Sequence, residues 1–400
     1  MPNQEPGPET LADAKLLAGF LGLAGNKRWK ERMEEIGRRV ALSSLTGRAA
    51  QERHALELML QRLSAPSALA NAGPAEQRLL SYAREAVRLA HELPAEPRQR
   101  LRALILSGLT GEANLIPLFH LLRVAALHRA RGFEVRFTGL ADGTPHDLLI
   151  TRNGAEAEVV CETLSAEEGR HVPRGDWCAL VDGINPDLQI WLAAHPGRYV
   201  LKMTLPDGLR ADALNVATLQ RRIIDMLRDQ KRQDSAADAV LKLDPLILAG
   251  AQAAVPAGAL RALFGPDAHL AVAHDKGNLL VLAARAGQAS GIAQAACRRM
   301  AAASTRLSGK QPAILAMFLD DLARPEWRNL REQRELEGAV RRFLTTEEAR
   351  GISAVSCATR MEMFGMAPPD GAAEGELRFR NPTRVSPRDA PLLAALTSLD

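Results

Sequence analysis

The sequence predicts a mixed α/β protein that begins with a helical region. Apolar residues recur at helical spacing through residues 10–107, whereas the pattern changes after Ala113. From there, short apolar runs are separated by Gly, Asn and Asp, as is typical of strands and turns between helices. An alternation of this kind predicts a mixed sheet with helices packed against it.

Composition and pattern divide the 400 residues into four expected parts. These are a helical region at 1–110, an α/β core at 111–235, a second α/β region at 236–365 and a surface tail at 366–400. The last part is rich in Pro, Gly and Ala, which favours loops. A chain of this length buries a hydrophobic core without help from disulfides or metals.

Cysteine usage and hydropathy indicate a reducing, aqueous environment. The four cysteines form no CxxC pair and lack nearby His-rich spacing, so we expect reduced thiols rather than a zinc site or disulfides. No apolar run approaches the roughly 18 residues of a membrane span, and the acidic, Pro-containing start does not resemble a signal peptide. We therefore expect a cytoplasmic protein with no membrane partner.

Basic residues exceed acidic ones only slightly, with a net charge of +4 and a pI near 9.0. This excess is compatible with DNA or RNA as partner without demanding one. Local clusters of basic residues favour such a partner slightly more, although a solvated helix face explains any one of them. The clusters are Lys27, Arg28, Lys30 and Arg32; Arg221, Arg222, Arg228, Lys231 and Arg232; and Arg298, Arg299, Arg306 and Lys310.

The core pattern begins with an amphipathic helix and continues through three strands. We expect the helix at 115–131, strands at 133–137, 147–150 and 156–163, and a hairpin turn at Asn153-Gly154. A helix at 177–194, a fourth strand at 199–205 and a helix at 211–230 complete one expected mixed sheet. The last third is expected to repeat the alternation, with strands at 270–273, 279–284, 313–319 and 352–358 and helices at 290–307 and 331–343.

Carboxylates gather in the hairpin of this core. On a strand, Glu156, Glu158 and Glu162 point to one face, and the turn brings that strand antiparallel to the one led by Asp147. Convergent carboxylates suit Mg²⁺, which takes oxygen ligands in octahedral geometry and activates water on phosphodiesters. The alternative is that these glutamates line the solvated side of an antiparallel sheet.

The order of helix, strand, Asp147-led strand, Asn-Gly turn and acidic strand resembles the PD-(D/E)xK nuclease superfamily. The resemblance covers about residues 112–205 and includes Val159-Val160-Cys161-Glu162-Thr163 followed by Gly169-Arg170. It implies a restriction-endonuclease-like fold, with Asp147 as the first metal ligand and Glu112 as a supporting acid. Glu158 would supply the missing ligand if the strand is shifted, and Arg170, His171 or Arg174 would neutralise phosphate.

Two defining positions differ from that family. Val160 stands where the second acidic residue belongs, and Glu162 stands in place of the lysine. Asp147, Glu158 and Glu162 would bind Mg²⁺ poorly, so we expect no robust nuclease activity. We also expect Val160→Glu combined with Glu162→Lys to be the pair best able to create that activity.

Three functions remain open on the sequence alone. The first is a weakened nuclease-fold protein that binds nucleic acid or assembles with other molecules, with Arg221, Arg222 and Arg228 as basic contacts. The second is an active Mg²⁺-dependent nuclease. The third is an adaptor without any connection to nucleic acid. A homo-oligomer or a protein partner would be held through the helical N-terminal region.

Overall fold

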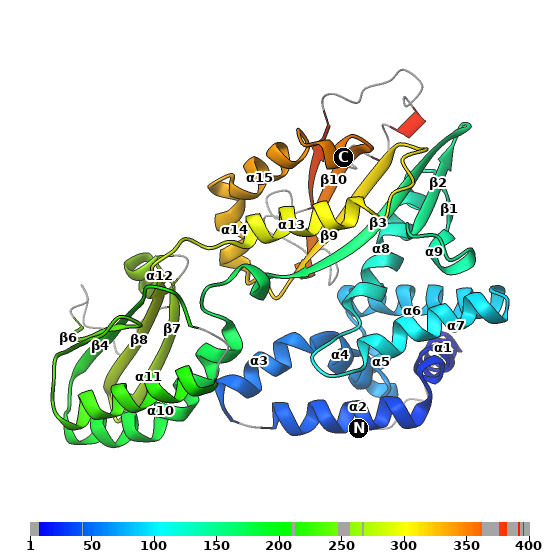
Figure 1. Cartoon of the computed structure of the whole chain (residues 1–400). Helices are drawn as coiled ribbons and strands as arrows, with labels where there is room; N and C mark the ends of the chain where they lie inside the picture. Colours follow the sequence, from blue (N-terminus) through cyan, green and yellow to red (C-terminus); the bar gives the residue numbers. More distant parts are fainter. Residues whose placement is uncertain are drawn as a thin grey trace.

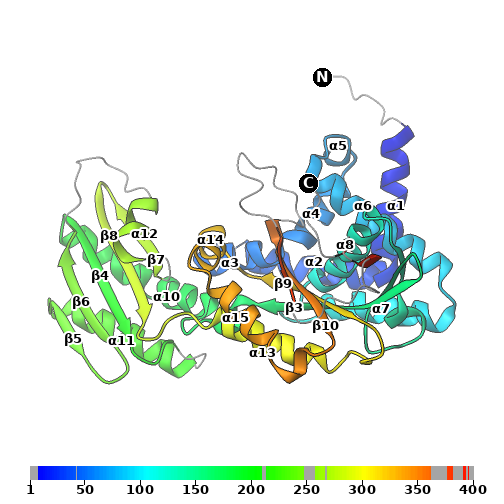
Figure 2. The ribbon, with the colours of Figure 1, turned by 90° about the horizontal axis from the view of Figure 1, so that it is seen from above.

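The computed structural model describes residues 8–41, 43–209, 213–246, 257–265, 268–361, 376–381, 391–392 and 395. It is a mixed α/β structure with two sheets, each flanked by helices, and a helical N-terminal region (Figures 1 and 2). No helix in these residues is both long enough and apolar enough to cross a bilayer.

The expected helical start is confirmed for the described residues, although it consists of several short helices. They are α1 (Pro8–Ala24), α2 (Asn26–Val40), α3 (Leu45–Arg53), α4 (Ala55–Leu63), α5 (Pro66–Ala70), α6 (Pro74–Glu92) and α7 (Ala95–Gly108). Their apolar faces pack with α8 (Ile116–Ala130) around Phe20, Leu60 and Phe119. The N-terminal helices and one face of the first sheet therefore share one core.

The first sheet has six strands in the order β1-β2-β3-β9-β10-β11. Strands β3, β9 and β10 run parallel, and the remaining neighbours are antiparallel. Their bounds are β1 (Glu134–Arg136), β2 (Leu148–Arg152), β3 (Ala155–Ser165), β9 (Ala313–Asp320), β10 (Ile352–Thr359) and β11 (Leu377–Arg380). Every residue of β9 is buried, as expected for a parallel strand covered on both faces.

Side-chain alternation along β3 assigns the helices to the two faces of this sheet. Ala157 and Val159 pack into the core formed with α8, whereas Val160 and Leu164 pack under helices of the opposite layer. That layer consists of α13 (Ile292–Ser304), α14 (Arg324–Glu332) and α15 (Glu335–Phe343). Short segments complete this half, namely α9 (Thr138–Ala141), η1 (Ala166–Gly169) and η2 (Glu347–Ala349).

The second sheet has five strands in the order β5-β6-β4-β8-β7 and lies apart from the first (Figure 1). Its strands are β4 (Arg198–Leu205), β5 (Gln233–Ser235), β6 (Val240–Pro245), β7 (His269–Asp275) and β8 (Asn278–Ala286). Helices α10 (Arg174–Ala194) and α11 (Ala213–Arg228) cover one face, and α12 (Ala257–Phe264) lies on the other. Only β4 and β8 are parallel neighbours here.

Two sequence-based expectations are wrong. The strand at 199–205 does not complete the first sheet, because β4 pairs with β6 and β8 in the second. Strand β9 takes the place beside β3 instead, so the expected unit at 111–235 contributes to both sheets. The expected surface tail is also partly built into the fold. Strand β11 pairs with β10 and covers an edge that would otherwise stay unpaired. Leu392 and Ala395 are buried as well. The rest of that tail lies outside the described residues.

The second sheet is an insertion between β3 and α13. The chain enters and leaves it at one point, where Gly291 N donates to Gly169 O at 2.9 Å. A side chain on Gly169 would collide with the backbone of Ile292, so glycine allows this close crossing. A whole α/β unit is therefore inserted at this crossing, and the first sheet continues beyond it with β9.

Candidate functional site

The β2–β3 hairpin brings Asp147 against β3 as expected. Asn153 and Gly154 both have positive φ, which matches the twist of a two-residue hairpin loop. Leu148 pairs with Val159, and Asp147 N donates to Val159 O at 3.0 Å. One carboxylate oxygen of Asp147, Oδ2, accepts a hydrogen bond from Cys161 N at 2.7 Å. The backbone of β3 thus fixes the orientation of this carboxylate.

Arg306, just beyond α13, binds Asp147 and Glu162 together. Its Nη2 donates to Asp147 Oδ1 at 2.7 Å, and its Nη1 donates to Glu162 Oε2 at 3.2 Å. The guanidinium Nε donates to Pro145 O at 2.8 Å, so all three nitrogens are engaged. Arg299 adds a second cation 3.7 Å from Glu162 Oε1. Asp147 and Glu162 therefore do converge, as the sequence predicts, but on a guanidinium supplied by the chain itself.

Glu158 lies on the same face of β3 yet has different partners. Its Oε2 accepts from Ser308 N at 2.9 Å, and its Oε1 accepts from Ser308 Oγ. The ring nitrogen Nδ1 of His146 lies 3.9 Å from Glu158 Oε1. Glu158 is only 3% exposed, so the alternative of a solvated glutamate face is wrong at this position.

Burial acts against the ion pairs at this site. Burial raises the pKa of Asp147, although Arg306 and the Cys161 N–H oppose the shift. Burial likewise raises the pKa of Glu162, with Arg306 and Arg299 opposing it and Asp147 adding to it. The two carboxylates are thus held close together at an electrostatic cost that the Arg306 guanidinium partly offsets.

The donor set of this site does not fit Mg²⁺ in the observed arrangement. A magnesium ion needs oxygen ligands at about 2.0–2.1 Å around one point, whereas Asp147 and Glu162 surround Arg306 and Glu158 is tied to Ser308. Across the part of the chain that the structure describes, no group of three or more His, Cys, Asp or Glu side chains is placed to hold a metal.

Val160 is fully buried among side chains of α13 and α15, including Ala296, Met300 and Val340. The position that carries an acid in the nuclease family thus belongs to the hydrophobic core here. A glutamate at this position would place a carboxylate in that core without a partner, so Val160→Glu is unsuited to creating a metal site.

Glu112 is not part of this carboxylate group. It is exposed and pairs with Arg39 and Arg53, and Arg53 in turn contacts Asp321 immediately after β9. Glu158, in contrast, pairs in register with Ala313 at the start of β9. The expected supporting acid therefore lies at the opposite end of the sheet from Glu158.

The expected phosphate contacts are mostly engaged with carboxylates. Arg170 is buried, donates to both oxygens of Glu326 at 2.7 Å and also contacts Glu167 and Asp321 O. Burial alone would lower the pKa of Arg170, but Glu326 and Glu167 raise it. Arg174 pairs with Glu52 at 3.0 Å. His171 lies at the rim of a cavity beside the second sheet, not beside Asp147.

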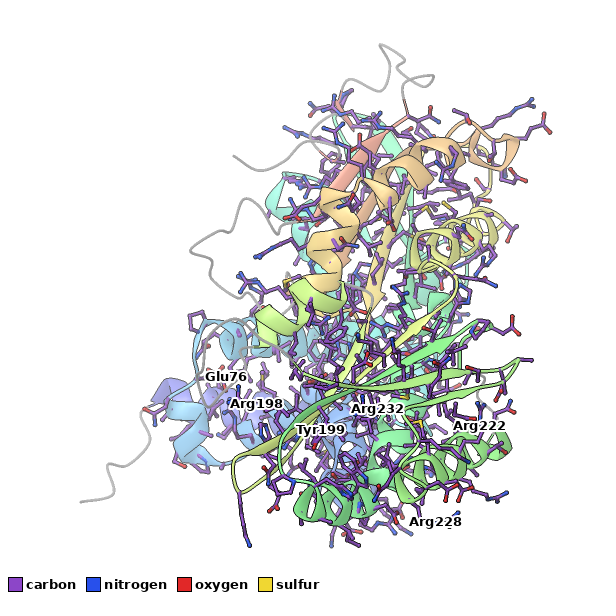
Figure 3. All side chains as sticks on the ribbon, turned by 90° about the vertical axis from the view of Figure 1, so that its left-hand side faces the viewer. Glu76, Arg198, Tyr199, Arg222, Arg228 and Arg232 are labelled. Atoms are coloured by element: carbon purple, nitrogen blue, oxygen red, sulfur yellow. The ribbon has the colours of Figure 1, made fainter. Side chains whose placement is uncertain are left out.

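The basic cluster on α11 is partly neutralised by neighbouring aspartates. Arg222 pairs with Asp234 and Asp238, and Arg228 pairs with Asp225. Arg221 is exposed. Figure 3 shows Arg222 and Arg228 on the helical side of the inserted unit. The three side chains are thus far from Asp147 in the fold, on a unit that the carboxylate site does not include.

Arg299, Arg306 and Ser308 are the site residues that sequence reasoning missed. The sequence did contain a signal, because Arg298, Arg299, Arg306 and Lys310 form a basic cluster within the second expected α/β region. No local pattern connects that cluster to Asp147, because Arg306 lies 159 residues after it. In comparisons with protein-family models, with curated proteins and with solved structures, nothing matched this chain.

Proposed function

We propose that this chain is a nuclease-like protein without nuclease activity that binds nucleic acid in the cytoplasm. The main support for this proposal is Arg306. Its guanidinium lies between Asp147 and Glu162, at the place where the family resemblance expects a metal ion. The helix α8, strands β1 to β3 and the Asn-Gly turn follow each other in the order that suggested this family. The four free cysteines suit a reducing compartment.

An arginine at this position supplies charge but no chemistry. A guanidinium remains protonated at all physiological pH values, so it neither ligates a metal nor takes a proton from water. With its nitrogens bonded to Asp147, Glu162 and Pro145 O, it holds the hairpin against α13. In this proposal, the residues that match the family's catalytic positions form a structural ion-pair network instead.

Nucleic acid fits the surface better than an apolar assembly interface. Among the described residues, the large apolar side chains that are strongly exposed are scattered, and only Leu11 lies in the N-terminal helices. Exposed cations such as Arg221, Arg298 and Lys310 instead lie on several elements. Binding through such cations falls steeply with salt, because phosphate contacts release counterions.

Calorimetry with Mn²⁺ and a DNA-cleavage assay test the proposed loss of catalysis. We expect wild type to bind no Mn²⁺ at millimolar concentration and to cleave nothing. Arg306→Ala is expected to gain weak binding, because it leaves Asp147 and Glu162 facing each other without a cation. The gain should disappear in Arg306→Ala combined with Asp147→Ala.

Arg298→Ala is the matched control, since Arg298 is an exposed arginine of α13 outside this network. It should leave metal binding unchanged. Metal-dependent cleavage by wild type that Asp147→Ala abolishes would overturn the proposal and identify an active nuclease.

A further inference from the structure

Two adjoining cavities lie on the face of the second sheet that carries α12. Their volumes are about 560 Å³ and 390 Å³, within the range of small-molecule sites. Both are lined by Thr204, Phe264, Ala268 and Arg285, so they adjoin, and we call the two together the groove. Thr204 and Arg285 are the penultimate residues of β4 and β8, the parallel pair of this sheet. Ligands of open α/β sheets bind outside the carboxyl ends of such strands.

One of the three cations that line the groove is unpaired among the described residues. Arg170, Lys202 and Arg285 line it, and Glu326 is the one carboxylate among its lining residues. Lys202 pairs with Asp244 at 3.1 Å. Glu326 is already neutralised, because both its oxygens accept from Arg170. Arg285 is exposed and has no charged partner among the described residues. The groove thus presents an available guanidinium, which is the side chain best suited to a phosphate group.

Further polar groups and an apolar wall complete the groove. The hydroxyl oxygen of Ser290 is buried without a hydrogen-bond partner and lines the larger cavity. His269 also lines it and packs against Trp177, and burial lowers the pKa of His269 to about 4, so it is a neutral donor or acceptor at pH 7. Phe264 is partly buried between the two cavities and offers an aromatic ring.

The rim of the groove is held by backbone hydrogen bonds. Gly287 N donates to Leu205 O at 2.8 Å, and Leu209 N donates to His171 O at 2.7 Å. The first bond joins the chain that leaves β8 to the last residue of β4, and the second joins the segment after β4 to the segment that enters the insertion. The two bonds fix the backbone at Gly287 and His171, two residues that line the larger cavity.

We propose that this groove binds a nucleotide, with its phosphate on Arg285 and its base against Phe264. The combination of an unpaired guanidinium, hydroxyl groups and a partly exposed aromatic ring matches an anion with a planar apolar part. The ligand is either a free mononucleotide or the phosphorylated end of a nucleic-acid strand. The choice of nucleotide chemistry rests on the proposed nucleic-acid binding, whereas the anion site rests on the groove alone.

Calorimetry on the full chain without divalent metal tests the groove independently of the carboxylate site. Titrations with AMP, adenosine, inorganic phosphate and 5′-phosphorylated or 5′-hydroxyl oligonucleotides separate the sources. We expect AMP to bind and adenosine to bind at least about tenfold more weakly, because charge-assisted hydrogen bonds to phosphate are lost. A strand-end site would bind the phosphorylated oligonucleotide more tightly than AMP, and a site for free nucleotides would do the reverse.

Variants assign the binding to its residues. Arg285→Gln should weaken AMP binding about tenfold or more, and Phe264→Leu should weaken AMP binding while leaving phosphate binding unchanged. Lys276→Gln is the matched control, since Lys276 is an exposed cation in the turn at the other end of β8. Equal losses in Arg285→Gln and Lys276→Gln, or no binding of any phosphate-bearing probe to wild type, would overturn the proposal. Neither result bears on Arg306 or on cleavage, so a failure of the proposed function remains distinguishable.

Discussion

At the scale of single residues, several buried polar side chains lie where the N-terminal helices meet α8 and the first sheet. Glu57 Oε1 accepts from Leu115 N at 2.6 Å, and Asn114 bonds to Asp320 at the end of β9. His54 lies beside Glu57 with its Nδ1 3.9 Å from Glu57 Oε2. Both side chains are fully buried, so their charge states at neutral pH are set by desolvation.

This pair predicts a distinctive pH dependence of stability. Burial raises the pKa of Glu57 to about 7 and lowers the pKa of His54 to about 4. A carboxyl with a raised folded-state pKa stabilises the protein fully below its unfolded pKa, and this contribution is lost as pH rises towards 7. A histidine with a depressed pKa acts oppositely, and its contribution is lost as pH falls from about 6.5 towards 4.

Glu57→Gln isolates the carboxyl contribution. Gln retains the acceptor for Leu115 N but does not ionise. Between pH 5 and 8 the unfolding free energy of wild type should therefore fall relative to that of Glu57→Gln. The expected fall is about 3 kcal/mol, from roughly 1.4 kcal/mol per pKa unit. Urea unfolding at a series of pH values measures it, with His54→Gln as the companion variant. A pH-independent difference would show that Glu57 is ionised in the folded protein.

At the scale of elements, β3 combines an apolar interior with a row of charged side chains. Val160 and Leu164 are buried under the α13 layer, and Glu162 between them reaches Arg306 at its edge. The strand thus has no spare polar position in its interior. Its neighbour β9 is buried along its whole length.

Val160→Glu should therefore destabilise the chain instead of building a metal site. An unpaired carboxylate in this core is expected to cost about 3 kcal/mol or more, measured as the loss of unfolding free energy in urea. Val160→Thr has nearly the shape of valine and should cost clearly less. Adding Glu162→Lys would not rescue Val160→Glu, because it also removes a partner of Arg306. Native-like stability of Val160→Glu would mean that this position is accessible to water.

At the scale of the whole molecule, the cores divide the chain into a main body and an insertion. The apolar clusters around β4 and β8 consist of buried residues between Val172 and Ala284, and among the described residues of the main body Leu45 and Ala49 of α3 pack against them. The chain crosses between the two parts at the Gly169–Gly291 contact. Each part therefore has its own buried core.

We expect each part to fold alone. A chain in which a two-residue linker replaces residues 172–289 should unfold cooperatively, because Gly169 and Gly291 are already adjacent and Arg170 keeps its bond to Glu326. Circular dichroism with thermal unfolding tests this for the shortened chain and for residues 172–289 alone. Leu45→Gln in the shortened chain controls for the apolar face of α3 that the deletion exposes. Loss of a cooperative transition in both parts would show that the cores depend on each other.

The sequence by itself determined most of the local structure. The helix near 115–131, the Asn153-Gly154 hairpin and the strands at β3, β9 and β10 follow from periodicity and turn residues, because those signals depend on near neighbours. The convergence of Asp147 with Glu162 was also predictable, since the hairpin fixes the register between their strands.

The tertiary structure alone decided which sheet each strand joins and what lies between the carboxylates. Strand β4 carries Arg198 and Lys202 whereas β9 is almost entirely apolar, but neither pattern specifies which strand lies beside it, so the insertion was not visible in the sequence. Arg306 reaches Asp147, and Arg285 joins Phe264 in the groove, only after chain segments far apart in sequence have packed. Pairing and packing between distant segments depend on the whole core, and therefore local sequence could not assign them.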